Sequence, residues 1–431
     1  MQHLNSTLEM VRRCHVFGNS RAELNSKEPD WLDGPTANFW HRLPRPIIGL
    51  SPMDGITDAA FREIIARHGC PDVIFTEFTH VHELTEGHPR AFDALCYTEL
   101  QRPIVAQLYG NSPERFYQAA HIVCALGFDG IDINMGCPSK TVASAGSGAG
   151  LIRTPELALS ILASTRQGIL DWAAGQALSA AGIPQSVVDC IHFSNAKWGR
   201  PDISRRIIPV SVKTRLGYDT IMMQEWGACL SQGNPDLITV HGRTLTQLYR
   251  GEANWEAIAQ VCPILHARGI LVLGNGDIRS PRDAVRRIRE SGVDGILIGR
   301  AAWGNPWIFQ HTAQIRQAVI QETDLRDVQG LPSLTDRFRL MVEHAQWFEH
   351  MFGQKRFFCM RKHLTRYCTG FPSAASLRAS MNRVSSAKDM HYLLDDVLKS
   401  HSAHFDDAAF FHPNQLGGCG TNRAGMTPTH S

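Results

Sequence analysis

Polar side chains that could take part in chemistry recur at the ends of short apolar segments in this chain. They are Asp54, Glu77, Gln107, Asn134, Lys213, His241 and Asn275. Cys137 follows one such segment directly and stands between Gly136 and Pro138. A free cysteine is most often a small buried hydrophobic residue, but a thiol at the mouth of a site can act as an acid or a nucleophile. Packing does not explain polar residues at these positions, so we expect them to form a site.

Two glycine-containing segments, LGNGDIRSP at 273–281 and GILIGRAAWGNP at 295–306, have the character of a phosphate site. Glycine lets backbone N–H groups approach a ligand closely, and the start of a following helix favours an anion. The sequence Gly-Asn-Gly-Asp could also be a simple tight turn. The presence of Gly299 and Arg300 after the next apolar segment favours phosphate binding.

Lys213, in the segment SVKTRLG, admits three interpretations. It could form a Schiff base, place a positive charge beside the pyrimidine edge of a flavin, or form a structural ion pair with an acid such as Glu77. His241 and Arg243 add two donors on the next segment. Gln107 carries an amide of the kind that fits the uracil-like edge of a flavin.

Eight apolar segments predict eight strands, at 47–53, 73–78, 104–110, 130–136, 209–216, 237–243, 270–275 and 295–300. Helical patterns separate them, at 58–68, 113–126, 155–167, 253–261 and 281–291. This alternation predicts a parallel sheet covered by helices on both faces. No GxGxxG follows the first strand, which argues against a dinucleotide-binding fold. Because polar residues end nearly every strand, we expect a closed (β/α)8 TIM barrel, whose active sites lie at the carboxyl ends of the strands.

The rest of the chain divides around this barrel, which we place at 45–311. Residues 1–44 are polar and aperiodic and predict a flexible extension, and 401–431 predict a flexible tail. The stretch 171–205 is longer than a usual connection, so we expect an insertion on the amino-terminal side of the fifth strand, away from the chemistry. Residues 333–400 predict an appended small helical domain.

Composition narrows the class of protein. The 43 Lys and Arg residues nearly balance the 41 Asp and Glu, for a net charge of +2, so the whole-chain charge does not predict a nucleic-acid partner. No apolar run approaches the roughly 20 residues that cross a bilayer. Eleven cysteines without paired spacing favour the cytoplasm over a disulfide framework. His80, His82 and His88 lack a compact ligand spacing, so we expect no metal, and nothing indicates an obligate protein partner.

One segment departs from this balance. Between positions 355 and 388 there is no Asp or Glu, but there are eight basic residues: Lys355, Arg356, Arg361, Lys362, Arg366, Arg378, Arg383 and Lys388. A charge run is usually a solvated face, and it can also hold a phosphate backbone. The interleaved Phe357, Phe358 and Tyr367 could stack on bases, although as helix residues we expect them to pack.

The motifs together resemble those of the tRNA-dihydrouridine synthases. The matching segments follow the order and spacing of that family: SPMDGITDAAFR (51–62), AQLYG (106–110), GIDINMGCPSKTV (130–142), VSVKTRLG (210–217), TVHGRT (239–244), GNGDI (274–278) and IGRAAWGNPWIF (298–309). MRKHLTRYCTGFPSAASLR at 360–378 is similar to part of the family's helical domain. The resemblance implies bound FMN, NADPH as the reductant and tRNA as the substrate.

The resemblance also implies roles for individual residues. The FMN contacts would be Pro52, Met53, Asp54, Gln107, Lys213, His241, Asn275, Gly276, Asp277, Gly299 and Arg300. Cys137 would be the catalytic acid, with Asn134 and Arg243 supporting the substrate. Arg361, Lys362 and Arg366 would contact tRNA. Ala143 stands where relatives commonly have Asn, and the Gly/Ser/Ala run 143–150 predicts a mobile lid.

The implied chemistry is consistent with these residue types. Reduced FMN would deliver hydride to C6 of uracil, and Cys137 would protonate C5. A thiol with a reference pKa of about 8.5 keeps its proton at neutral pH. Three other functions compete: an FMN barrel oxidoreductase of a small molecule, a Schiff-base lyase using Lys213, and a non-catalytic RNA-binding protein.

Overall fold

The structure, a computed structural model, describes residues 38–200, 202–325 and 332–400. The chain forms two compact units, one before residue 332 and one that contains most of the residues after it. The predicted tail at 401–431 lies outside the described residues, as does most of the predicted extension. Within the described parts of the chain, no helix is long and apolar enough to cross a membrane.

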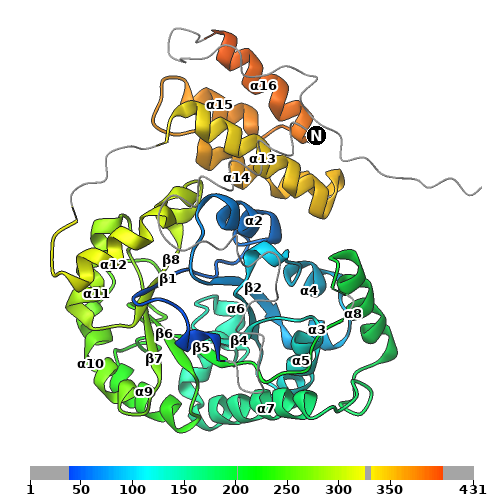
Figure 1. The fold of residues 1–431 in the computed structure, drawn as a ribbon, viewed down its shortest axis with the longest axis vertical. Helices are drawn as coiled ribbons and strands as arrows, with labels where there is room; N and C mark the ends of the chain where they lie inside the picture. The colour runs from blue at the N-terminus through cyan, green and yellow to red at the C-terminus, as the bar shows by residue number, and fades with distance from the viewer. Residues whose placement is uncertain (1–37, 201, 326–331, 401–431) are drawn as a thin grey trace, which may run out of the picture. The chain divides into compact units, whose positions relative to one another are not determined.

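The first unit is a closed barrel of eight parallel strands, as predicted (Figure 1). Each strand pairs with the next along the chain, and the first pairs with the last, so that Ile47 lies opposite Gly295. The strands are β1 (Ile47–Leu50), β2 (Ile74–His80), β3 (Ile104–Tyr109), β4 (Gly130–Met135), β5 (Val210–Arg215), β6 (Leu237–His241), β7 (Leu271–Asn275) and β8 (Gly295–Ile298).

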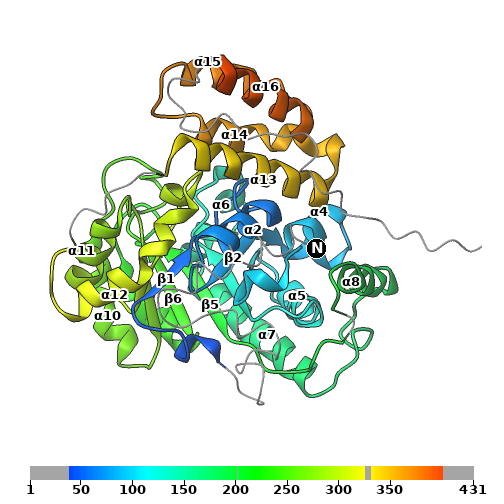
Figure 2. The same ribbon diagram turned by 45° about the horizontal axis from the view of Figure 1, so that its top comes forward.

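Helices surround the barrel (Figure 2). Side-chain caps fix the start of several of them: Asp58, Ser112 and Ser280 each accept a hydrogen bond from a backbone N–H of the first turn. The helices are α2 (Ala59–His68), α3 (Val81–Thr85), α4 (Pro89–Ala94), α5 (Pro113–Ala125), α6 (Lys140–Ser144), α7 (Pro155–Ala173), α8 (Gln185–Lys197), α9 (Met223–Gln232), α10 (Trp255–His266), α11 (Pro281–Ser291) and α12 (Thr312–Ile320), with short 3-10 turns η4 (Phe39–His41), η5 (Glu99–Gln101), η6 (Gly148–Arg153), η7 (Arg300–Ala302) and η8 (Pro306–His311).

The end of the predicted flexible extension is ordered, which corrects that prediction for residues 38–44. Phe39 and Trp40 are each 1% exposed and pack against the first residues of the strands, including Ile47 and Leu237. Asn38 holds this turn, because its side chain accepts from the N–H of Trp40 and donates to Asp236. Two large aromatic side chains thus close the amino-terminal end of the barrel.

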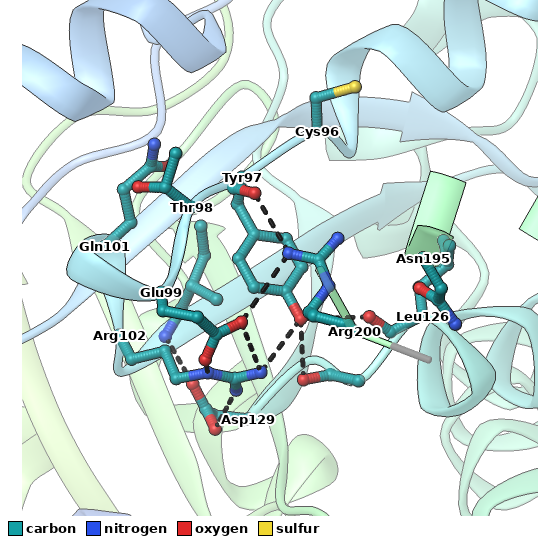
Figure 3. A network of polar contacts seen from close by, with 12 residues as sticks. Cys96, Tyr97, Thr98, Glu99, Gln101, Arg102, Leu126, Asp129, Asn195 and Arg200 are labelled. Atoms are coloured by element: carbon teal, nitrogen blue, oxygen red, sulfur yellow. Dashed lines mark hydrogen bonds and ion pairs between the residues drawn. The ribbon is translucent and has the colours of Figure 1, made fainter. Parts of the chain in front are cut away.

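The insertion at 171–205 contains the end of α7 and all of α8. The amide of Asn195 in α8 donates to the backbone carbonyl of Ala125 at 2.8 Å, which ties α8 to the end of α5. Beyond α8, Arg200 donates to the carbonyl of Tyr97 at 3.0 Å, and its guanidinium lies 3.7 Å from the centre of the Tyr97 ring (Figure 3).

A buried carboxylate near the contact between Arg200 and Tyr97 forms ion pairs with two arginines. Asp129, which directly precedes β4, accepts from Arg102 at 2.7 Å and from Arg206 at 2.9 Å. The phenol of Tyr97 in turn accepts from Arg102 at 3.0 Å. Because Asp129 lies at the amino end of its strand, Arg206, which directly follows the insertion, is held on the side of the barrel away from the carboxyl ends.

The second unit consists of helices α13 (Leu334–Phe352), α14 (Arg361–Tyr367), α15 (Ala374–Met381) and α16 (Ala387–Ser400), with the 3-10 turn η9 (Gln354–Cys359). Phe357 and Tyr367 are each 1% exposed, so they pack as expected. Phe358, by contrast, is 61% exposed. The hydroxyl of Tyr367 is 3.0 Å from Nδ1 of His344, which joins α14 to α13.

Candidate active site

Strand register brings most of the predicted polar residues side by side. Asn134 lies opposite Lys213, Arg215 lies opposite His241, and His241 lies opposite Asn275. These pairs are at the carboxyl ends of β4 to β7, which is where a barrel builds its active site. Residues from four strands therefore share one end of the barrel.

A chain of hydrogen bonds holds the backbone at Cys137. Gln107 donates to Asp132 at 2.6 Å and accepts from Asn134 at 3.0 Å. The Oδ1 atom of Asn134 accepts hydrogen bonds from the backbone N–H groups of Gly136 and Cys137, at 3.0 and 2.8 Å. Asn134, predicted to support the substrate, therefore positions the cysteine.

Asp132 is the buried end of this chain. Burial raises its pKa to about 6, although hydrogen bonds from Ser211 and Gln107 and the charge of Lys213 favour the ionised form. Gln107 is 1% exposed, and both ends of its amide have protein partners. The network thus fixes the side chain that the sequence assigns to a flavin edge.

The environment of Cys137 keeps its thiol protonated. The residue is 8% exposed. Burial raises its pKa, as does the charge of Asp54, while the Ser139 N–H and the cations Arg215 and Lys213 act in the opposite direction. A thiol whose pKa lies above the ordinary value holds its proton at neutral pH, as an acid must.

Lys213 has an unusual electrostatic position. Burial, together with the nearby charge of Arg215, lowers its pKa to about 8. Among the described residues its ammonium group has no hydrogen-bond or ion-pair partner. The interpretation of Lys213 as a structural ion pair with Glu77 therefore does not hold, which leaves the flavin-edge and Schiff-base interpretations.

His241 carries a neutral imidazole. Burial lowers its pKa well below the ordinary value, and the charges of Lys213, Arg215 and Arg243 lower it further. Its Nδ1 atom is buried and has no hydrogen-bond partner among the described residues. A buried ring nitrogen without a partner is unusual and is consistent with a site that a ligand completes.

The loops after β7 and β8 present unused backbone donors. The N–H groups of Gly276, Asp277, Gly299 and Arg300 donate to no protein group among the described residues. Gly276 and Asp277 have φ values of +131° and +52°, and successive backbone N–H groups in a turn can form a concave nest that binds anions. The guanidinium of Arg300 lies 3.1 Å from Asp277. This set of donors fits a phosphate group.

The carboxylate of Asp277 holds the loop after β7 in place through several hydrogen bonds. Burial alone would raise its pKa, but hydrogen bonds from Arg243 and from the N–H of Ala253 lower it below its ordinary value. Arg243 is 2% exposed and also donates to the carbonyl of Gly251 at 2.6 Å. Arg243 thus joins the loop after β6 to the loop after β7, while its Nη1 atom has no hydrogen-bond partner among the described residues.

The other predicted contacts are distributed as follows. Pro52, Met53 and Asp54 form the turn after β1, where the N–H of Met53 donates to Thr57 at 3.0 Å. Asn275 donates to the carbonyl of Leu297 at 2.8 Å. Arg361, Lys362 and Arg366 lie in α14 of the second unit.

The segment 143–150 is only partly a surface loop, which corrects the prediction of a lid along its whole length. Ser144 and Ala145 are exposed, but Ser147 to Gly150 are buried, and the N–H of Ala149 donates to the carbonyl of Cys137 at 3.3 Å. A Cβ at Gly148 would lie 3.0 Å from that of Cys137. The small residues there allow close packing under the cysteine.

Sequence reasoning missed Arg215. It is 4% exposed, and its Nε donates to the carbonyl of Gly136 at 2.7 Å, directly before Cys137. Burial lowers its pKa to about 10. Side chains alternate between the two faces of a strand, so Arg215 lies on the same face as Lys213, and this spacing could have identified it.

The comparisons with known proteins bear on this site directly. The sequence model described as "Dihydrouridine synthase (Dus)" matches residues 49–169 and 199–402. The chain belongs to the dihydrouridine synthase family. It is 32% identical to a probable tRNA-dihydrouridine synthase 2 of Bacillus subtilis, over 84% of this chain and 97% of that protein. It is 30% identical to a probable tRNA-dihydrouridine synthase of Staphylococcus aureus, over 83% of this chain and 95% of that protein.

Among solved structures, a DHODH from Eimeria tenella aligns with a TM-score of 0.40 and 10% identity, over 74% of this chain and 90% of that one. This similarity is too weak to distinguish functions. The match to the dihydrouridine synthase family omits residues 170–198, which include all of α8. The family model therefore matches the barrel on both sides of α8 but not α8 itself.

Proposed function

We propose that this chain reduces uridine in tRNA to 5,6-dihydrouridine, with FMN as its cofactor and NADPH as the reductant. The observation that carries the proposal is the position of Cys137, whose backbone N–H is held by Asn134 at the barrel mouth that also holds Lys213 and the unused donors of the β7 and β8 loops. The family of the chain supports the same reaction.

The residues present fit FMN. The free amides of Gly276, Asp277, Gly299 and Arg300 would hold its phosphate, with His241 nearby. The ammonium group of Lys213, which has no partner among the residues that the structure describes, would lie beside the pyrimidine edge of the ring and favour negative charge there. When bound, FMN supplies the hydride that reduces the C5=C6 bond of uracil at C6.

The protein supplies the proton. Cys137 donates its thiol proton to C5 of uracil, while Asn134 and Arg215 hold the peptide group between Gly136 and Cys137 through its N–H and its carbonyl. The resulting thiolate lies near the charges of Arg215 and Lys213, which stabilise it until it takes up a proton again.

The target base must leave its stack to reach the barrel mouth, at a cost on the order of a few kcal/mol. Contacts to the RNA backbone would offset that cost. Lys355, Arg383 and Lys388 are exposed in the helical unit, and Phe358 offers an exposed ring for stacking. We assign this unit to tRNA binding.

Absorption spectroscopy tests the proposal. Purified protein should show a flavin spectrum that bleaches with NADPH under anaerobic conditions and recovers when tRNA lacking dihydrouridine is added. Recovery with a small dihydroorotate-like substrate but not with tRNA would favour the oxidoreductase alternative. A protein that takes up no FMN would overturn the proposal, and trapping of Lys213 by borohydride would then support a lyase.

A further inference from the structure

A cavity of about 250 Å³ lies at the carboxyl ends of β2 and β3, beside the proposed uridine site. Its lining includes the partly buried rings of Phe78, His80 and Tyr109. The Tyr109 ring makes edge-to-face contacts with the other two, each with centroids 4.8 Å apart. Ser139, from the loop that carries Cys137, also lines the cavity. We call this space the β2–β3 cavity.

The β2–β3 cavity holds polar groups that the protein leaves unused. Asp54, Glu83 and Arg90 are the charged residues that line it, and the exposed side chains of Glu83 and Arg90 have no ion pair or hydrogen bond among the described residues. Thr79, which also lines it, is 3% exposed, and its hydroxyl has no partner within the described chain. Buried hydroxyl groups normally have partners, so the Thr79 hydroxyl indicates a ligand.

The chemistry of the lining selects the class of ligand. Aromatic rings at the edge of a site bind unstacked bases of RNA. The carboxylate of Glu83 accepts hydrogen bonds only, so it selects a base edge with two adjacent donors, and guanine has this edge in N1–H and its 2-amino group. Adenine and nicotinamide present a donor beside an acceptor, which a carboxylate repels. The guanidinium of Arg90 suits a phosphate of the same strand.

We propose that the β2–β3 cavity binds a guanine base that neighbours the target uridine in the RNA strand. This inference rests on the tRNA substrate proposed above. It assigns to Glu83 the recognition of the base, to the rings its stacking and to Arg90 a phosphate contact. The enzyme would then select its uridine by a neighbouring nucleotide as well as by the fold of the tRNA.

The experiment uses the full-length flavoprotein and tRNA in which guanosines next to the reduced uridine are replaced by inosine, which lacks the 2-amino group. Glu83→Gln should raise the KM for tRNA about tenfold, as expected for loss of one bidentate base contact. Inosine should raise the KM of the unaltered protein by a similar factor. The two changes combined should cost little more than either alone, because they remove the same contact.

Controls separate this inference from other effects. Glu86→Gln, in the turn that follows α3, should leave the KM for tRNA unchanged, since Glu86 does not line the cavity. Flavin reduction by NADPH should be equal in all three proteins. Additive penalties, or equal KM values for Glu83→Gln and Glu86→Gln, would overturn the inference. A slower NADPH step in Glu83→Gln would assign the cavity to the dinucleotide instead. Absence of any dihydrouridine with the unaltered protein would instead overturn the proposed function.

Discussion

At the residue scale, the acid role of Cys137 depends on a thiol that is both held and protonated. Replacing Cys137 with Ala should slow dihydrouridine formation about 100-fold or more, the usual contribution of a general acid. FMN content and flavin reduction by NADPH should remain, because the thiol takes part in neither step. The measurement is single-turnover reoxidation of the reduced flavin by tRNA.

Cys124→Ala provides a matched control for that variant. Cys124 is also buried, in α5, and burial raises its pKa to about 12, but it lies outside the site. Its loss should leave the reoxidation rate unchanged. Loss of flavin from Cys137→Ala alone would show that Cys137 supports the cofactor site and is not the acid.

Lys213 gives a pH dependence whose direction follows from its pKa. Because that pKa is lowered to about 8, the group is charged below pH 8 and loses its charge as the pH rises through this value. FMN should therefore bind most tightly below pH 8, and the Kd should rise up to about tenfold per pH unit above it. Fluorescence quenching of FMN by the apoprotein measures this.

Arginine at the same position should abolish that dependence, since a guanidinium stays charged over this range. The same pH profile in Lys213→Arg would show that the titrating group is another residue. His241 does not compete for the assignment, because its pKa lies well below the ordinary value and it is neutral throughout.

At the scale of elements, the insertion should stabilise the barrel without serving the chemistry. Arg200→Ala removes a hydrogen bond to the Tyr97 carbonyl and the stacking on its ring. The free energy of unfolding should fall by about 2 kcal/mol, as for a buried charged hydrogen bond. Urea unfolding should show a lower midpoint with an unchanged slope, while kcat stays constant.

Arg205→Ala tests whether the stabilisation by Arg200 depends on its burial. Arg205 also stacks on an aromatic ring, 3.9 Å from the centre of Trp172, but it is exposed. Its loss should cost less than about 1 kcal/mol, as for other exposed charged contacts. Equal losses in the two variants would contradict the assignment of the Tyr97 contact as the anchor of the insertion.

The elements were more predictable than their contacts. Buried parallel strands are short apolar runs between helical patterns, so the sequence located all eight strands of the barrel. The contact between Arg200 and Tyr97 joins residues 103 positions apart, and no local pattern encodes it. Composition also misled: the small residues at 147–150 indicate mobility when read alone, yet they pack beneath Cys137.

At the scale of the molecule, the proposed role of the helical unit is electrostatic. Lys362→Glu combined with Arg366→Glu should weaken tRNA binding and reduce the slope of log K against log salt by about 2, one for each lost phosphate contact. Filter binding at salt concentrations from about 50 to about 200 mM measures the affinity for tRNA and its salt dependence. Arg361 is less suitable, because its Nε holds the carbonyl of Val384 at 2.9 Å.

A charge reversal in the barrel unit serves as the control. Arg286 in α11 is exposed and pairs with Asp283 at 3.3 Å. Arg286→Glu changes the net charge of the protein without touching the basic segment 355–388, so it should leave the salt slope in place. Equal effects of both reversals would indicate a response to net charge and contradict a defined RNA contact.

The closure of the barrel has a consequence for synthesis of the chain. β1 is complete early in translation, but its partner β8 emerges only after the six intervening strands. At a synthesis rate of roughly 5–20 residues per second, one edge of β1 stays unpaired for on the order of tens of seconds. A Cβ at Gly295 would overlap the backbone of Ile47 at this seam. Gly295→Ala should therefore hinder the pairing of β8 with β1 after the other strands have formed. The open barrel should aggregate more and bind chaperones for longer during synthesis.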